Sequence, residues 1–146
     1  MMMTAFFSLG GSAVLTKKIG GRDNTMIHAY LMSAASLAAG FGGYVIWSNK
    51  EMYNKPHFTT DHGQFGALTA AWMVVYSLPT YILYNPDNGL LRQNTFFRTV
   101  HKYSGKLLIA MGLVTCAYGI VAMEKDGWKA GALIASLLLP APVFLL

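Results

Sequence analysis

A run of spanning length decides the fold: residues 99–122 read TVHKYSGKLLIAMGLVTCAYGIVA. As a helix with ~1.5 Å rise per residue, it would cover about 36 Å, enough for a hydrocarbon core of roughly 30 Å. Three more apolar runs approach the same length, at residues 26–47, 64–84 and 128–146. The sequence therefore predicts an all-α, multi-pass membrane protein.

The composition agrees with a bilayer environment and excludes several other classes of protein. The 146 residues are 54% hydrophobic and only 12% charged, whereas soluble domains carry about 25% charged residues. The net charge of +5 does not indicate nucleic-acid binding, because the basic residues lie at the ends of apolar runs rather than on one patch. Cys116 is the only cysteine, so an internal disulfide and a cysteine-held metal cluster are both excluded.

The connections between the runs predict their topology. Residues 48–61, 85–98 and 123–127 are each too short to contain another spanning helix, so the four helices should alternate up and down in one bundle over residues 25–146. The arm before them, residues 1–24, is apolar for only about 15 residues, and a spanning helix needs roughly 20. We expect this arm to lie at the membrane interface or to be covered by a partner.

Basic residues are distributed unequally between the two predicted sides of the membrane. The amino-terminal side carries seven and the opposite side four, and the richer side is expected to face the cytosol, matrix or stroma, with both termini. The seven are Lys17, Lys18, Arg22, Arg92, Arg98, Lys102 and Lys106, and the four are Lys50, Lys55, Lys125 and Lys129.

Three of the four histidines lie where apolar runs begin, at His28, His62 and His101. An imidazole at membrane depth must have its ring nitrogens satisfied, so each of the three is a candidate functional residue. The alternative is that histidines at helix ends contact lipid headgroups or water. The sequence leaves both interpretations open.

Two of these histidines are followed by a glycine four residues later, in HGQFG (62–66) and HKYSG (101–105). Residues i and i+4 share one face of a helix, and a histidine that holds a flat metal-bearing ring would need that face clear. Gly66 and Gly105 are therefore candidate cofactor-binding positions. The alternative is that both glycines serve helix packing.

Three segments together resemble the cytochrome b561 family: HAYLM (28–32), DHGQFGALTAAWMVVYSLPTYI (61–82) and FFRTVHKYSGKLLIAMGLVTCAYGI (96–120). The resemblance implies a helical membrane core that binds b-type haem through pairs of histidines and moves electrons across the bilayer. This chain departs from the pattern, because the helix expected between the matches at His28 and His62 is absent. The runs that begin at these two histidines are consequently antiparallel.

Chain direction then restricts which histidines could share one haem iron. His28 and His62 should lie at opposite faces of the membrane, whereas His28 and His101 begin their helices from the same side. We expect His28 and His101 to be the metal ligands of one haem b, with Arg98, Lys102 and Lys106 near its propionates. The alternative for these three is ordinary positive-inside charge. His62 would need a second ligand from another chain.

The function implied is that of an integral-membrane subunit of a respiratory or photosynthetic electron-transport complex. Its partners would be the lipid bilayer and other membrane subunits, in the mitochondrial inner membrane or the thylakoid. The alternatives are a haem-free accessory subunit, a stand-alone b561-type reductase linked to ascorbate or quinol, and a pigment-binding protein. The apolar runs show no hydrolytic triad, phosphate loop or carboxylate pair, so redox chemistry is expected rather than hydrolysis or group transfer.

Overall fold

The computed structural model describes residues 5–139, and every regular element in that part of the chain is helical. The predicted all-α class is therefore confirmed. The elements are a short π-helix η1 (Ala5–Gly10) and the α-helices α2 (Gly11–Ile19), α3 (Arg22–Met52), α4 (Asp61–Leu83), α5 (Thr95–Met123) and α6 (Gly127–Leu138).

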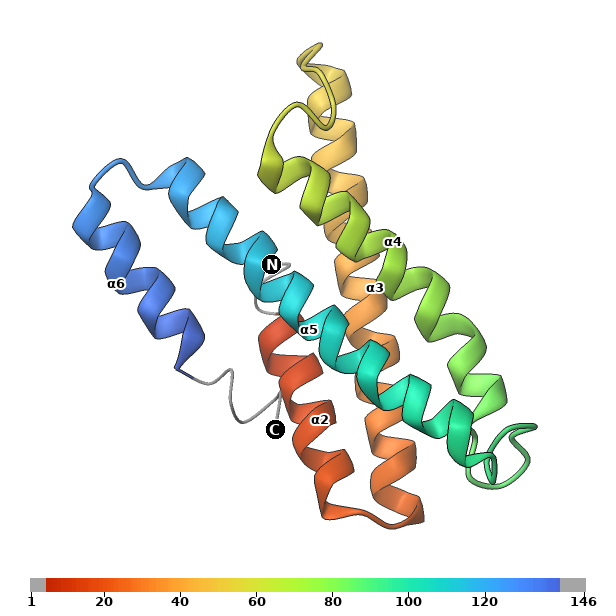
Figure 1. Ribbon diagram of the computed structural model, residues 1–146. Coiled ribbons are helices and arrows are strands. Elements are labelled where there is room, and N and C mark those ends of the chain that lie inside the picture. Colours follow the sequence, from red (N-terminus) through yellow and green to blue (C-terminus); the bar gives the residue numbers. More distant parts are fainter. Residues whose placement is uncertain (1–4, 140–146) are drawn as a thin grey trace.

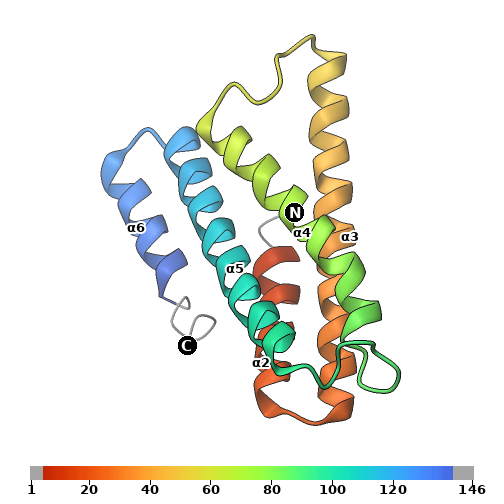
Figure 2. The same ribbon diagram turned by 45° about the vertical axis from the view of Figure 1, so that its right-hand side comes forward.

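Three of these helices, α3, α4 and α5, are long and apolar enough to cross a membrane. They contain most of the first three apolar runs, and they alternate in direction as predicted (Figures 1 and 2). The expectation of four spanning helices is confirmed only in part. Helix α6 has 12 residues, too few to span, and residues 140–146 of the fourth run lie outside the described residues.

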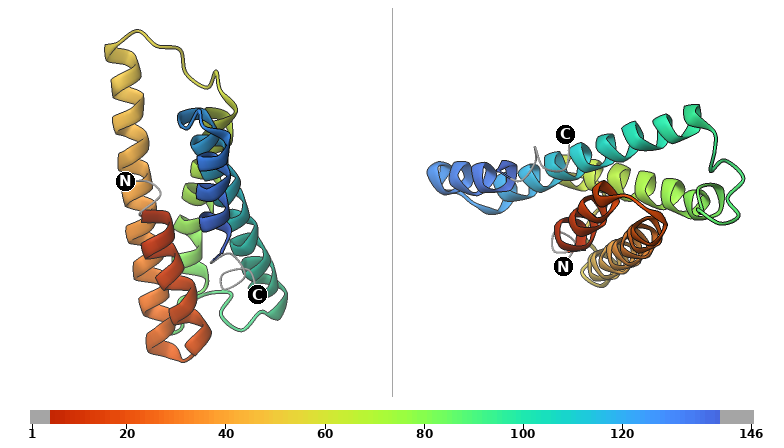
Figure 3. Two further views of the ribbon diagram at one scale, coloured as in Figure 1. Left: turned by 90° about the vertical axis from the view of Figure 1, so that its left-hand side faces the viewer. Right: turned by 90° about the horizontal axis from the view of Figure 1, so that it is seen from below.

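Residues 5–19 of the amino-terminal arm form helices that double back along α3. Gly20 and Gly21 make the turn with φ values of 81° and 87°, a region that residues with a side chain rarely adopt. Helix α2 then packs beside the first half of α3 (Figure 3), and the Ala13 side chain is fully buried there. The structure thus shows α2 packed on α3, while the proposed division at residues 24 and 25 remains a prediction.

Within residues 5–139, two apolar clusters hold the helices together. Ala35, Met73 and Leu108 bring α3, α4 and α5 into contact at the centre. A second cluster joins α5 to α6, and it consists of Leu113, Cys116, Ile120, Ala130 and Leu137. Much of α3 remains exposed, and only Ala35 and Gly42 are buried along it. An exposed apolar helix face suits contact with lipid or with other membrane helices.

Side-chain caps fix where two of the spanning helices, α4 and α5, begin. The Oγ1 atom of Thr60 accepts a hydrogen bond from the Gly63 N–H at the start of α4. The Oδ1 atom of Asn94 accepts one from the Phe97 N–H at the start of α5. Such caps satisfy backbone donors that have no partner inside the helix, and they set the register in which His62 and His101 follow.

Candidate functional site

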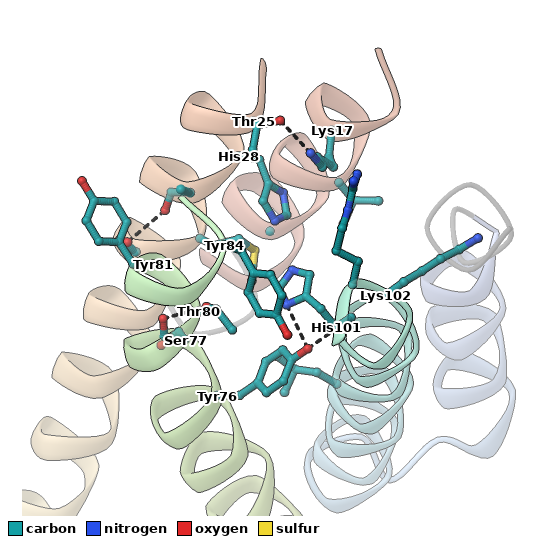
Figure 4. Close-up of a pocket in the computed structure, with 18 of the residues that line it drawn as sticks. Lys17, Thr25, His28, Tyr76, Ser77, Thr80, Tyr81, Tyr84, His101 and Lys102 are labelled. Atoms are coloured by element: carbon teal, nitrogen blue, oxygen red, sulfur yellow. Dashed lines mark hydrogen bonds between the residues drawn. The ribbon is translucent and has the colours of Figure 1, made fainter. Parts of the chain in front are cut away.

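A cavity of about 1000 Å³ opens at the end of the bundle where α3 and α5 begin and α4 ends. Both His28 and His101 line it, together with residues from α2, α4 and the connection between α4 and α5 (Figure 4). Cofactor sites typically occupy roughly 300–1,000 Å³. The cavity is therefore large enough for an extended organic group.

His28 lies in the second turn of α3 and is anchored by α2. Its Nδ1 is 2.9 Å from the Ala13 carbonyl oxygen. A carbonyl only accepts hydrogen bonds, so Nδ1 carries the hydrogen and Nε2 keeps its lone pair. The return of α2 along α3, enabled by the turn at Gly20 and Gly21, places this acceptor.

His101 lies in the second turn of α5 and is anchored by Tyr76 of α4. The phenol oxygen of Tyr76 is 2.9 Å from Nδ1 of His101, and it donates to the His101 carbonyl oxygen at 2.9 Å. A phenol has one hydrogen, so the contact at Nδ1 is a bond that the imidazole donates. His101 therefore also presents the lone pair of its Nε2.

The two imidazoles lie at a separation that suits one metal ion. Their ring centres are 6.4 Å apart and their planes are nearly perpendicular, at 86°. Metal–imidazole bonds are about 2 Å long, so a metal bound by two opposite imidazoles separates the ring centres by roughly 6 Å. Among the hydrogen bonds of residues 5–139, none occupies Nε2 of either ring.

Two imidazoles alone do not complete a metal site. Within the described part of the chain, no group of three or more His, Cys, Asp or Glu side chains could hold a metal ion. An ion between His28 and His101 would therefore need its remaining ligands from a non-protein group, as the four nitrogens of a porphyrin provide. The donor set and the cavity both fit a haem that His28 and His101 would hold.

Basic side chains surround the mouth of this cavity. Arg98, Lys102 and Lys106 all line it, as does Lys17 of α2. The ammonium of Lys17 donates to Thr25 Oγ1 at 2.6 Å (Figure 4). Burial lowers the pKa of Lys17 below its usual value, and the positive charge of Arg98 lowers it further. A carboxylate placed among these cations would relieve that repulsion.

The two glycines of the H-x-x-x-G pair have different surroundings. A Cβ atom built on Gly105 meets nothing within 4 Å, and Gly105 lines the cavity beside His101. A Cβ atom on Gly66 would lie 3.5 Å from the Thr115 methyl group on α5. Gly105 thus leaves space for a bound ring, whereas Gly66 faces the contact between α4 and α5, and its predicted role in cofactor binding remains a prediction.

His62 lies at the other end of the bundle, as chain direction requires, and is not part of this cavity. Its Nδ1 donates to the Thr115 carbonyl oxygen at 2.9 Å, so it has the same tautomer as the other two helical histidines. Its ring rests on Gly119, where an added Cβ would lie 3.0 Å from the imidazole.

His57 differs from the three helical histidines. It lies in the connection between α3 and α4, where its ring stacks on Trp47 with ring centres 3.8 Å apart. Its Nε2, the nitrogen that the other three leave open, is 2.8 Å from a carboxylate oxygen of Glu51. His57 is therefore a structural contact at the end of α3.

The family comparison agrees with this arrangement of histidines. The family model described as eukaryotic cytochrome b561 matches residues 1–125, which is most of the chain. The chain belongs to the cytochrome b561 family. No match was found among the curated proteins or among the solved structures. The b561 match includes the arm as well as α3, α4 and α5, so α2 is part of the region that this family shares.

Sequence reasoning missed three contributors to this candidate site, which are Tyr76, Lys17 and the Ala13 carbonyl. It also missed Gly119, which contacts His62 at the opposite end of the bundle. Tyr76 lies in an apolar run, where an aromatic residue is usually a packing or interface residue. Lys17 and Ala13 precede α3 in the chain and reach the site only because the arm folds back. The motif around His62 gave no signal for Gly119, which lies 57 residues further along the chain, on α5.

Proposed function

We propose that this chain is a one-electron carrier of the membrane that holds a single haem b between His28 and His101. One observation carries the proposal. Two imidazoles from different helices lie 6.4 Å apart at a large cavity, each with Nδ1 occupied by an oxygen and Nε2 left open. Membership in the cytochrome b561 family supports it independently.

Each part of the site has a role in this proposal. A bound haem b supplies a centre that accepts and releases one electron. His28 and His101 would hold it through their Nε2 atoms, and the Ala13 carbonyl and the Tyr76 phenol orient the two imidazoles. Arg98, Lys102, Lys106 and Lys17 line the cavity and would bind the propionate carboxylates by charge-assisted hydrogen bonds. Gly105 leaves the surface of α5 clear beside the ligand.

The proposal is tested by measuring the haem content of the protein before and after the proposed ligands are substituted. Protein purified in detergent should contain one protohaem per chain with a low-spin spectrum, and His28→Ala or His101→Ala should abolish that spectrum. The matched control is His62→Ala, which removes a helical histidine with the same tautomer from the opposite end and should retain the haem. Haem that persists without His28 and His101, or that requires His62 instead, would refute the proposed pair.

We propose further that the chain works as a subunit of a larger electron-transport complex in the mitochondrial inner membrane or thylakoid. The exposed apolar length of α3, with only Ala35 and Gly42 buried, supports a role beside other membrane helices. Blue native electrophoresis of solubilised membranes distinguishes the alternatives. Co-migration with a large complex is expected, whereas a haem-loaded monomer would favour a stand-alone reductase.

We propose that the cavity side, with residues 84–94, faces the matrix, stroma or cytosol, because basic residues are in excess on that side. Cys116, the only cysteine of the chain, is buried, so an introduced cysteine can be labelled selectively. Asn88→Cys should react with a membrane-impermeant maleimide from the positive side, and Lys55→Cys from the opposite side. The reverse labelling pattern would reject this orientation.

A further inference from the structure

We infer that Tyr76 is a positioning residue for His101: its phenol fixes the tautomer of the imidazole and strengthens the bond that Nε2 makes to a haem iron. The inference rests on the proposed function, because it concerns how the ligand is held and tuned. It assigns a specific task to a side chain of α4, a helix that contributes no haem ligand in the proposal.

The contact geometry is defined by two hydrogen bonds and a ring stack. The Tyr76 oxygen lies 2.9 Å from Nδ1 of His101 and 2.9 Å from its carbonyl oxygen. Because the single phenol hydrogen goes to the carbonyl, the oxygen must accept from Nδ1–H. The two rings are stacked at 15° with centres 5.4 Å apart, so the imidazole plane is also fixed (Figure 4).

The two proposed ligands differ in how they are held. The Nδ1 of His28 meets a backbone carbonyl, that of Ala13, which no substitution removes. The Nδ1 of His101 meets a side-chain oxygen, which one substitution deletes. His101 is therefore the ligand whose hydrogen bond can be removed without changing the main chain.

A second tyrosine supplies the matched control. The ring of Tyr84 also packs on His101, with centres 4.9 Å apart. Its hydroxyl, however, donates to the Phe97 carbonyl oxygen at 2.9 Å and does not meet the imidazole. Tyr76→Phe and Tyr84→Phe therefore each remove one phenol oxygen beside His101, and only the first removes the partner of Nδ1.

The expected direction follows from the electronics of the ligand. A hydrogen bond from Nδ1–H to oxygen makes the imidazole more basic, which favours the ferric over the ferrous state. Its loss in Tyr76→Phe should raise the midpoint potential and weaken haem binding. Partners of this kind are typically worth at least about tenfold in metal affinity, so the haem affinity of Tyr76→Phe should fall by at least about tenfold. A loss that is tenfold greater for ferric than for ferrous haem raises the midpoint potential by about 59 mV.

The experiment uses the full chain in both apo and haem-loaded forms. In the apoprotein labelled with ¹⁵N-histidine, NMR should show Nδ1–H for His101 in the wild type and in Tyr84→Phe, and a mixture of tautomers in Tyr76→Phe. In the loaded protein, potentiometric titration followed by haem absorbance should give a higher potential for Tyr76→Phe alone. Haem titration into the apoprotein should show the loss of affinity.

The two readouts separate this inference from the proposed function. Wild-type protein that takes up no haem refutes the proposed function, and the apoprotein spectra then decide whether Tyr76 sets the tautomer. If haem binds but Tyr76→Phe keeps the wild-type potential and affinity, the inference is overturned while the proposed function stands. An equal shift in Tyr84→Phe would also overturn it, because ring packing would then be the cause.

Discussion

At the scale of single residues, Gly119 is the position where one added methyl group should matter most for His62. A Cβ there would lie 3.0 Å from Cε1 and 3.1 Å from Nδ1 of the imidazole. Replacing glycine by alanine inside a helix typically raises the folding stability by about 0.8–1.0 kcal/mol. Overpacking a filled contact typically lowers that stability by about 1–3 kcal/mol. Gly119→Ala should therefore lower the free energy of unfolding or leave it unchanged.

The comparison variant for Gly119 is Gly131→Ala, because a Cβ on Gly131 in α6 meets nothing within 4 Å. Gly131→Ala should therefore gain only the stability that alanine's higher helix propensity provides. Unfolding by SDS titration should thus rank Gly119→Ala below Gly131→Ala by about 1–3 kcal/mol. Equal stabilities of the two variants would mean that the His62 ring is not seated on this glycine.

Gly105 should respond to substitution in the opposite way, through binding rather than through folding. The space beside it is open, so Gly105→Leu should leave the helix content and stability of the apoprotein intact. A leucine there would fill the space beside the His101 ring, so a bound haem should meet an overpacking cost of about 1–3 kcal/mol. Haem affinity should therefore fall by at least about fivefold. Haem titration measures the loss, with Gly131→Leu as the control that keeps wild-type affinity.

At the scale of helices, α4 and α5 are joined by a polar contact within an apolar interface. The hydroxyls of Thr69 and Thr115 lie 3.1 Å apart, and each also donates to a carbonyl in its own helix. Since each hydroxyl has one hydrogen, the contact between helices competes with the local bonds. We therefore expect Thr69→Val to cost about 0.6 kcal/mol, the average for such bonds in membranes.

The control for this contact is Thr16→Val in α2, since Thr16 makes the same local bond, to the Ser12 carbonyl oxygen. Steric-trap or SDS unfolding should separate the two variants by a few tenths of a kcal/mol up to about 1.7 kcal/mol. A Thr69 variant as stable as the Thr16 variant would show that the contact contributes nothing measurable to the pairing of α4 and α5.

The sequence predicted the long helices well and the short ones poorly. Apolar runs of spanning length lie mostly within α3, α4 and α5, because hydrophobic length alone determines a membrane span. Hydrophobic length does not predict how residues 5–19 pack, because they are too few to span a membrane. Their return along α3 depends on Gly20 and Gly21, whose positive φ values a sequence does not reveal.

The candidate site also has features that the sequence predicts and features that it does not. Chain direction was enough to predict that His28 and His101 lie on one side and His62 on the other, because consecutive spans must alternate. The hydrogen bonds that set the histidine tautomers were not predictable, since they depend on the rotation of α4 about its axis and on the approach of α2. The roles of Tyr76 and Ala13 as hydrogen-bond partners of the histidines therefore emerge only from the structure.

At the scale of the whole molecule, one ion pair ties the connection between α4 and α5 to the start of α3. The guanidinium of Arg22 binds both carboxylate oxygens of Asp87, each at 2.7 Å, and Arg92 donates to the Asp87 carbonyl oxygen. The connection lies at the mouth of the cavity through Asn85 and Pro86. The pair therefore helps to hold one edge of the proposed haem site in place.

The pH dependence of the Arg22–Asp87 ion pair follows from the pKa of Asp87. The hydrogen bond from Arg22 lowers this pKa below its usual value of 3.8. A carboxyl whose pKa is lower in the folded state stabilises the fold above its unfolded pKa, and that contribution is lost as the pH falls through the folded value. Wild type should therefore be more stable than Asp87→Asn at pH 7 and at pH 5 by the same margin. The margin should shrink only below about pH 4.

Thermal unfolding in detergent at pH 7, 5 and 3 measures this margin, and Asp23→Asn is the comparison variant. Asp23 also contacts Arg22, at 3.1 Å, but it is adjacent in sequence and ties no second segment, so its removal should change stability less. A margin for Asp87→Asn that already changes between pH 7 and pH 5 would assign the titration to another group, such as a histidine. The absence of a change there would mean that the cavity mouth keeps its shape throughout the neutral range, so that any pH dependence of electron transfer in this range arises elsewhere in the molecule.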